Sequence, residues 1–171
     1  MSEKLSEFKR EYIDGYVYAV SDVDRRHATI SGNIAFSFHS GAKGSHCVVY
    51  KSDIKVRVAS NKCYFYPDVV VDCDDDDTDD YYLEKPCLIV EVLSKSTEKR
   101  DRSEKLLSYM NIPSLKAYLL VEQDKSDVEF FYRKEDGDWW VESFEGLDTV
   151  IKLPCPDMEL TLADIYESVS F

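Results

Sequence analysis

Two apolar runs constrain the fold of this chain more than any other feature. Tyr64–Val71 and Cys87–Leu93 follow each other closely, and neither alternates regularly between polar and apolar residues. Short continuous apolar runs bounded by polar loops are typical of strands buried on both faces. We therefore expect two central strands with other elements packed over both faces.

The segments around these runs predict an α/β (mixed α+β) fold. Ile30, Ile34 and Phe38 recur at helical spacing and predict a helix between His27 and Lys43. A second helix is expected over Ser96–Met110, where Asp101-x-x-Glu104 resembles a capping box. A hairpin about Asp14-Gly15 and a strand over Cys47–Val58, bent near Ser52, complete the N-terminal half.

The C-terminal half adds shorter strands and a last helix. The strand candidates are 117–121, 128–132, 139–144 and 150–153, and Thr161 opens a short helix within Leu160–Tyr166. No internal repeat or linker-like stretch interrupts the chain. We expect one domain spanning residues 1–171, with a mixed central β-sheet flanked by helices and additional C-terminal strands.

The charge of the chain is strongly acidic. Asp plus Glu number 34 against 21 Lys plus Arg, giving a formal net charge of −13, while 44% of residues are hydrophobic. This balance argues against a generic nucleic-acid binder, because phosphate contacts depend on clustered basic residues. No run is long enough to span a membrane and the charged N-terminus does not resemble a signal peptide, so we expect a soluble, cytoplasmic protein.

Five cysteines are spread along the chain without a metal-binding or disulfide-forming pattern. They are Cys47, Cys73, Cys87, Cys155 and Cys63, with no C-x-x-C pair and no histidine at a zinc-ligand spacing. We expect reduced thiols, most of them acting as small buried hydrophobes.

An acidic run separates the two central strands. Residues 72–80 read DCDDDDTDD, and like charges in a block repel one another. The run lacks the spacing and distal glutamate of an EF-hand calcium loop. We expect a solvated loop.

Two carboxylates flank that loop within the apolar runs. Glu91 interrupts the second run, and Asp68 follows Pro67 in the first. If the strands pair antiparallel about the middle of the acidic loop, Asp68 lies opposite Glu91, and like charges there need a shared proton or a cation such as Mg²⁺. In the alternative interpretation, Asp68 caps a strand end and Glu91 pairs with a core lysine or arginine.

Several short motifs occur in an order that resembles one nuclease family. They are Tyr12-Ile13-Asp14-Gly15, His27, Ser52–Val56, Tyr66-Pro67-Asp68-Val69, Pro86 with Leu88–Ser94, Ser96-Thr97, Asp101-Arg102 with Lys105, and Tyr109 with Ile112–Leu115. Together they resemble the Uma-two family, labelled restriction endonucleases, within the PD-(D/E)XK nuclease superfamily. The resemblance covers nearly the whole chain.

The resemblance implies a restriction-endonuclease-like core and a metal site. It implies Asp68 and Glu91 as ligands of Mg²⁺ or Mn²⁺, the Val92 carbonyl as a third ligand and Glu11 as an additional acidic residue, although Glu11 also fits a surface charge on an edge strand. Members of the superfamily carry a lysine two residues after the acidic residue, where this chain has Leu93. Lys105, on the following helix, is the candidate for a migrated catalytic lysine; a solvated surface charge is the alternative.

Three further residues are secondary candidates. His27 could orient a phosphate or could simply begin a helix. Asp53 matches the family pattern without a role that we can derive. Tyr109 lies four residues after Lys105, on the same helical stripe, and could position it.

Two functions from different classes remain open at this point. The first is a metal-dependent endonuclease that hydrolyses DNA phosphodiesters, with Lys99, Arg100, Arg102 and Lys105 as a local basic patch. The second is an inactive nuclease fold kept for binding or assembly, in which C-terminal aromatics (Phe130, Phe131, Tyr132, Trp139 and Trp140) cover a subunit interface. A symmetric homodimer is the default assembly. Only the first function requires specific metal binding at Asp68 and Glu91.

Overall fold

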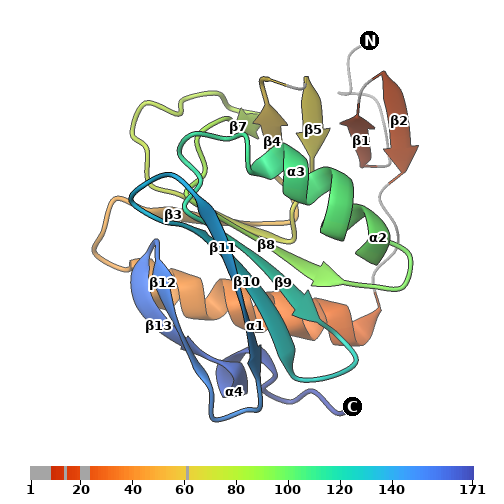
Figure 1. Cartoon of the computed structure of the whole chain (residues 1–171), viewed down its shortest axis with the longest axis vertical. Coiled ribbons are helices and arrows are strands. Elements are labelled where there is room, and N and C mark those ends of the chain that lie inside the picture. Colours follow the sequence, from red (N-terminus) through yellow and green to blue (C-terminus); the bar gives the residue numbers. More distant parts are fainter. Residues whose placement is uncertain (1–8, 14, 20–23, 61) are drawn as a thin grey trace.

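The largest element of the computed structural model is a six-stranded mixed sheet. The structure describes residues 9–13, 15–19, 24–60 and 62–171. The strand order is β11-β10-β9-β8-β6-β3, and Figure 1 labels all of these strands except β6. Its strands are β3 Val48–Lys51, β6 Val69–Asp72, β8 Leu88–Leu93, β9 Ala117–Glu122, β10 Asp127–Arg133 and β11 Trp139–Glu145.

The two apolar runs form neighbouring central strands, as predicted. Every residue of β6 and β8 is buried. The strands pair antiparallel with Val69 opposite Val90 and Val70 opposite Ile89, which is the register expected from the acidic loop. β8 then pairs parallel with β9. Because β6 and β8 are paired and buried on both faces, the side chains at the ends of these two strands have fixed positions.

Helices and a second sheet cover the two faces of this sheet (Figure 1). Helix α1 (Arg25–Ala42) confirms the first predicted helix and packs Ile30, Ile34 and Phe38 against alternate residues of β6 and β8. The opposite face packs against Phe65 and Tyr109 in a separate core cluster. Burial on both faces explains why the sequence of these strands does not alternate.

The second sheet has five strands in the order β2-β1-β5-β4-β7. They are β1 Arg10–Ile13, β2 Tyr16–Ala19, β4 Lys55–Val58, β5 Cys63–Phe65 and β7 Tyr82–Leu83. β1 and β2 form the predicted hairpin, of which Asp14 lies outside the described residues. The two residues of β7 were not predicted.

Two predicted strands are each divided between the two sheets. Cys47–Val58 is not one bent strand, because Ser52 has a φ of 56° and the chain leaves β3 in one sheet to enter β4 in the other. Likewise, the run Tyr64–Val71 divides at Pro67 into β5 and β6. A residue in the left-handed region and a proline both break a strand ladder, and the apolar pattern alone does not reveal this.

The second predicted helix exists, but it is divided differently and capped differently. It consists of α2 (Glu98–Arg100), a π-helical segment η2 (Asp101–Lys105) and α3 (Leu106–Tyr109). The predicted capping box at Asp101 and Glu104 is wrong, because Thr97 is the N-cap residue and Asp101 lies inside the helix, buried. The π-helical turn therefore carries two buried charged residues at its ends, Asp101 and Lys105.

The C-terminal region adds a two-stranded sheet, β12 Val150–Pro154 and β13 Asp157–Thr161, and helix α4 Leu162–Ile165. Thr161 caps α4 as predicted, in a capping box with Asp164. The strand β13 was not predicted. Among the described helices, none combines the length and apolarity needed to cross a membrane.

The prediction of reduced cysteines is wrong for four of the five. Disulfides join Cys47 to Cys73 and Cys87 to Cys155. These cysteines are far apart in sequence. Strand pairing brings Cys47, Cys73 and Cys87 to one end of the six-stranded sheet, and the C-terminal hairpin brings Cys155 to them. Cys63 is buried on β5, in the other core cluster.

A pair of leucine substitutions tests the central position of β9. Leu119 is completely buried, whereas Leu107 on α3 is 65% exposed. We expect Leu119→Ala to lower the free energy of unfolding by about 2–5 kcal/mol, because it removes buried contacts and leaves a cavity. Leu107→Ala should cost less than about 0.5 kcal/mol in the same urea titration. Similar losses in both variants would contradict this account of the core.

Candidate active site

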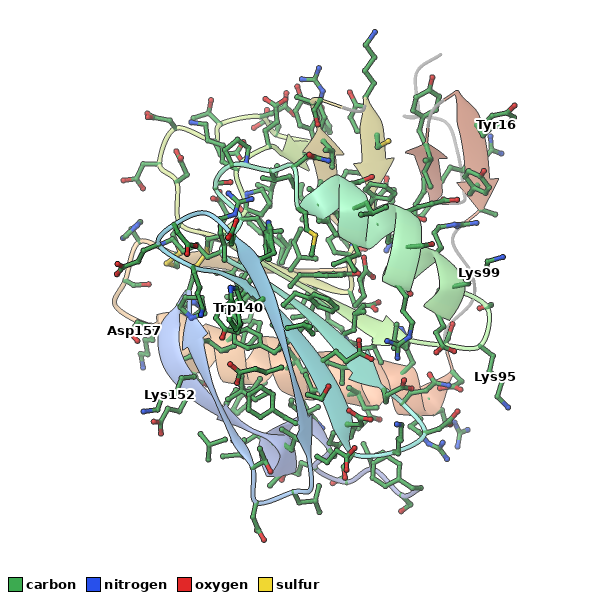
Figure 2. All side chains as sticks on the ribbon, viewed as in Figure 1. Tyr16, Lys95, Lys99, Trp140, Lys152 and Asp157 are labelled. Atoms are coloured by element: carbon green, nitrogen blue, oxygen red, sulfur yellow. A yellow bond between two sulfur atoms is a disulfide. The ribbon has the colours of Figure 1, made fainter. Side chains whose placement is uncertain are left out.

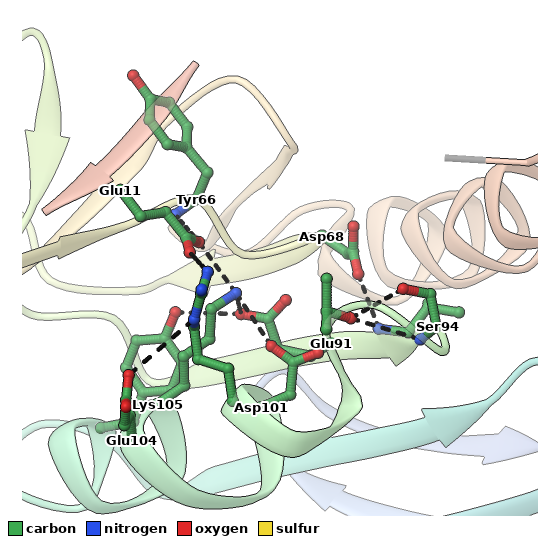
Figure 3. Close-up of polar contacts among 12 residues, drawn as sticks. Glu11, Tyr66, Asp68, Glu91, Ser94, Asp101, Glu104 and Lys105 are labelled. Carbon is green, nitrogen blue, oxygen red and sulfur yellow. Dashed lines mark hydrogen bonds and ion pairs between the residues drawn. The ribbon is translucent and has the colours of Figure 1, made fainter. Parts of the chain in front are cut away.

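A buried lysine lies at the centre of the candidate site. Lys105 ends the π-helical segment η2 and is only 4% exposed. Its Nζ lies 3.0 Å from Glu91 Oε1, 3.0 Å from Glu11 Oε1 and 3.2 Å from Asp101 Oδ1. Figure 3 shows these three carboxylates gathered around the ammonium group. The alternative that Lys105 is a solvated surface charge is therefore wrong.

Glu91 is the carboxylate that the central sheet contributes. It lies on β8 on the same face as Ile89 and Leu93, toward the helix that carries Lys105. Its Oε1 also accepts a hydrogen bond of 3.1 Å from the Tyr109 hydroxyl. Glu91 thus pairs with a core lysine, as one interpretation of the sequence expected. Its strand also has the register with β6 that the other interpretation assumed. Tyr109 and Lys105 therefore share Glu91 Oε1 as a hydrogen-bond acceptor.

Glu11 reaches the same cluster from the N-terminal hairpin. It lies on β1 and is 4% exposed, so the edge-strand surface interpretation is wrong. Its carboxylate accepts a hydrogen bond from the Tyr66 backbone N–H at 3.3 Å and lies 3.5 Å from the guanidinium of Arg100. The hairpin is therefore tied to both the β5–β6 connection and the helix.

Asp101 is the member of the cluster that the sequence analysis assigned to another role. It is 1% exposed and lies four residues before Lys105. Two opposite charges at this spacing on one helical stripe are a recognised sequence signal and would have identified the pair. π-Helical turns also occur frequently at functional sites.

Asp68 lies beside this cluster, immediately before the first residue of β6. Its Oδ2 accepts a hydrogen bond of 2.7 Å from the Val92 backbone N–H and lies 3.1 Å from His27 Nε2. The Asp68 side chain is 15% exposed, whereas that of Glu91 is 4% exposed. The site is thus more exposed to solvent at Asp68, just before β6, than at Glu91. His27 reaches it from the first turn of α1, where its backbone N–H is held by Asp24.

Burial and charge shift several pKa values in the site. Burial raises the pKa of Glu91 well above its usual range; the charges of Asp101, Asp68 and Glu11 add to the shift, and Lys105 opposes it. Burial alone would lower the pKa of Lys105, but Glu91, Asp101 and Glu11 raise it well above its usual value. Lys105 is therefore a fixed positive charge. Its three carboxylate neighbours leave an excess of negative charge that a proton or a cation must offset.

The pKa of His27 is also raised. Burial acts to lower it, but the hydrogen bond and charge of Asp68 and the Val92 backbone outweigh burial. A protonated imidazole is thus stabilised next to the Asp68 carboxylate.

Other sequence candidates lie outside this constellation. The Asp53 side chain is 86% exposed and pairs with Lys9. Arg102, from the expected basic patch, is held by Glu98, Glu122 and Glu129. These contacts leave Arg102 and Asp53 outside the cluster around Lys105.

Comparison with known proteins identifies the family of this chain. The Uma2 family, described as “Putative restriction endonuclease”, matches residues 3–163. The chain belongs to the Uma2 family. The sequence resemblance is thereby confirmed for almost the whole chain.

Two cyanobacterial proteins are similar to this Uma2 chain. Uncharacterized protein slr1290 of Synechocystis sp. is 32% identical over 170 residues, covering 99% of this chain and 89% of its own length. Uncharacterized protein sll1609 of the same organism is 28% identical over 153 residues, covering 88% and 86%.

A solved structure supports the fold. A “putative nuclease belonging to DUF820” from Anabaena variabilis matches with a TM-score of 0.80, covering 96% of this chain and 93% of that chain at 15% identity. The expected mixed α+β, restriction-endonuclease-like fold is confirmed.

A substitution of His27 tests its raised pKa. A group whose folded pKa lies above its unfolded value of 6.5 stabilises the protein fully below that value and loses this effect as pH rises through the folded pKa. We expect His27→Gln to cost about 1–2 kcal/mol at about pH 5.5 and clearly less at about pH 9, measured by urea unfolding. His39→Gln, on the exposed end of α1, should cost little at either pH. Equal losses for His27→Gln at both pH values would refute the assignment.

Proposed function

We propose that this Uma2 chain is a metal-dependent endonuclease, acting through one domain that spans residues 1–171. One observation carries the proposal: the ammonium of Lys105 reaches Glu91 from the next helix. Leu93 occupies the usual lysine position and is buried in the core. The chain therefore retains a lysine beside the acidic residue by another route.

The donor atoms of the site fit a hard divalent cation. Asp68 and Glu91 offer carboxylate oxygens, the Val92 carbonyl is a further oxygen ligand, and Mg²⁺ prefers such ligands together with waters. The buried negative charge around Lys105 has to be offset by a proton or by a cation, and a bound divalent ion would supply that charge. We assign Asp68, Glu91 and Val92 as the residues that would hold Mg²⁺ or Mn²⁺, with Glu11 as an outer carboxylate. When bound, the ion would supply a water of lowered pKa and neutralise charge on the phosphate.

The protein residues have separable roles in this proposal. Lys105, kept protonated by its carboxylate neighbours, offsets negative charge on the scissile phosphate and does not act as a base. Tyr109 fixes the orientation of Glu91 through its hydroxyl. His27 holds Asp68 from α1. Catalysis would rest on Asp68, Glu91 and Lys105, with Tyr109 and His27 as positioning residues.

DNA is the substrate class that we propose. Lys95 and Lys99 are exposed and project from the segment after β8 (Figure 2), and within the described part of the chain neither forms an ion pair. They could contact phosphates, whereas Arg100 and Arg102 from the same segment contact carboxylates. With a net charge of −13, contacts this few give weak binding that salt weakens further.

A cleavage assay at low salt tests the proposed catalytic residues. Single-stranded, duplex and branched DNA are incubated with Mg²⁺ or Mn²⁺ and with wild type, Asp68→Asn, Glu91→Gln or Lys105→Met. We expect each variant to lose about 10²-fold or more in rate, because each removes a ligand or a charge that stabilises the transition state. Asp157→Asn and Lys152→Met, on the exposed C-terminal hairpin labelled in Figure 2, are matched controls and should retain the wild-type rate.

A metal-dependent shift in melting temperature separates loss of the site from loss of the fold. Lys105→Met leaves buried carboxylates unpaired and can unfold the protein, whereas Asp68 lies at the open side of the site. We expect Mg²⁺ or Mn²⁺ to stabilise wild type but not Asp68→Asn. A folded wild type that does not cleave DNA, and whose melting temperature does not change with metal, would contradict the nuclease proposal. It would favour the inactive binding protein.

The structure offers little support for an aromatic interface in that alternative. Of the five C-terminal aromatics, Phe130 is buried, and Phe131 and Trp139 pack against the core. Trp140 is 52% exposed on the edge strand β11, next to Val141 at 53%.

We propose β11 as the contact of a symmetric homodimer, because an exposed edge strand can pair with its copy. Light scattering should give twice the chain mass for wild type and a monomer for Val141→Lys. A monomeric wild type would remove the dimer from the proposal.

A further inference from the structure

Four cysteines converge at the end of the six-stranded sheet that lies away from the candidate active site. Cys47 immediately precedes β3, Cys73 follows β6, Cys87 precedes β8 and Cys155 follows β12. β3, β6 and β8 are neighbours in the sheet, so three of the four come from adjacent strand ends. Glu91 and Val92 lie toward the other end of β8.

The strand register places the sulfur atoms together. Val48 pairs with Asp72, and the next pair outward in the same register is Cys47 with Cys73, whose Cα atoms are 4.1 Å apart. The backbone N–H of Cys87 bonds to Val71 O at 2.8 Å, which holds the start of β8 beside the end of β6. Cys155 approaches from the C-terminal hairpin, which packs on the same core cluster.

The two disulfide bridges contact each other through the sulfur of Cys73. Cys73 Sγ lies 3.4 Å from Cys87 Sγ and 3.2 Å from Cys155 Sγ, across the boundary between the two disulfides. The ligand atoms of Cys47, Cys73 and Cys155 all lie within 4.8 Å of one another. Cys87 lies outside this group of three, although its sulfur contacts that of Cys73, so a common ligand requires the sulfurs of Cys87 and Cys47 to move closer together.

We propose that, when reduced, this four-cysteine cluster is a structural site for one thiophilic divalent ion, with Zn²⁺ as the cation of choice. Zinc binds four thiolates tetrahedrally at about 2.3 Å, which places neighbouring sulfurs roughly 3.8 Å apart. The two contacts between the disulfides, 3.4 and 3.2 Å, are about 0.4 and 0.6 Å shorter than that spacing. Small side-chain rotations complete the tetrahedron once the sulfur–sulfur bonds are broken.

Burial and surrounding charge suit a closed structural site. Cys87 and Cys155 are 6% and 4% exposed, while Cys47 and Cys73 are half-buried and leave a path for an ion. The acidic loop begins at the cluster, with Asp72 buried beside it. Four uncompensated thiolates next to aspartates would repel one another, so the reduced cluster needs either four protons or a cation.

The chemistry balances with a named reductant. Each disulfide accepts two electrons from one phosphine molecule, which takes the oxygen of a water to become its oxide and leaves the two water protons on the sulfurs. Two phosphines therefore give four thiols, and binding of Zn²⁺ releases the four thiol protons. The bound ion would tie the C-terminal hairpin to β3, β6 and β8.

The test measures metal content and thiol protection and does not depend on nuclease activity. The full chain is purified in a phosphine reductant without chelator, and zinc per chain is measured by plasma mass spectrometry. Thiols are labelled with a maleimide before and after chelation and counted by mass spectrometry. The variants are Cys73→Ser and, as the matched control, Cys63→Ser in the other core cluster.

We expect about one zinc per chain in wild type and Cys63→Ser, with four thiols protected until the chelator is added. Cys73→Ser should lose most of the zinc, and added Zn²⁺ should raise the melting temperature of reduced wild type but not of this variant. Reduced, folded wild type without zinc would overturn the proposal, as would two disulfides that persist in the reductant without metal. Wild-type metal content decides the question even if a variant does not fold.

Discussion

The buried ammonium of Lys105 is the interaction on which the arrangement of the site depends. A lysine charge in the core is tolerated only when carboxylates surround it, and here they come from three separate elements: Glu11 on β1, Glu91 on β8 and Asp101 in its own π-helical turn. Removing one partner of such a group typically costs 3–5 kcal/mol. The same contacts that keep Lys105 charged therefore fix the hairpin and the helix against the central sheet.

The sequence was sufficient for the parts of the fold that local pattern determines. The runs of β6 and β8, the apolar spacing of α1 and the Thr161 cap of α4 each reflect contacts made by neighbouring residues. The division of two expected strands at Ser52 and Pro67 depends on which sheet each half joins. That choice is made by packing between distant segments, and it leaves no periodic signal.

The sequence likewise predicted only those parts of the candidate site that do not depend on packing between distant segments. The assumption that the strands fold about the middle of the acidic loop gave the register of β6 and β8 correctly. The expectation that the next helix packs beside these strands was enough to select Lys105. Asp101 was misassigned because a short acidic residue near a helix start more often caps the helix than pairs inside it. The cysteines were misread for a different reason, since they meet only through the pairing of β3, β6 and β8 and the packing of the C-terminal hairpin against the same core.

The ladder between β6 and β8 makes the spacing of the two acidic residues independent of the connection between them. The connection is closed at its base by strand pairing, with Val71 opposite Leu88. Doubling the length of a closed flexible loop costs only about 0.6 kcal/mol in entropy. The acidic segment lies at the end of these strands away from the candidate active site. Relatives can therefore insert or delete residues there without moving Asp68 relative to Glu91.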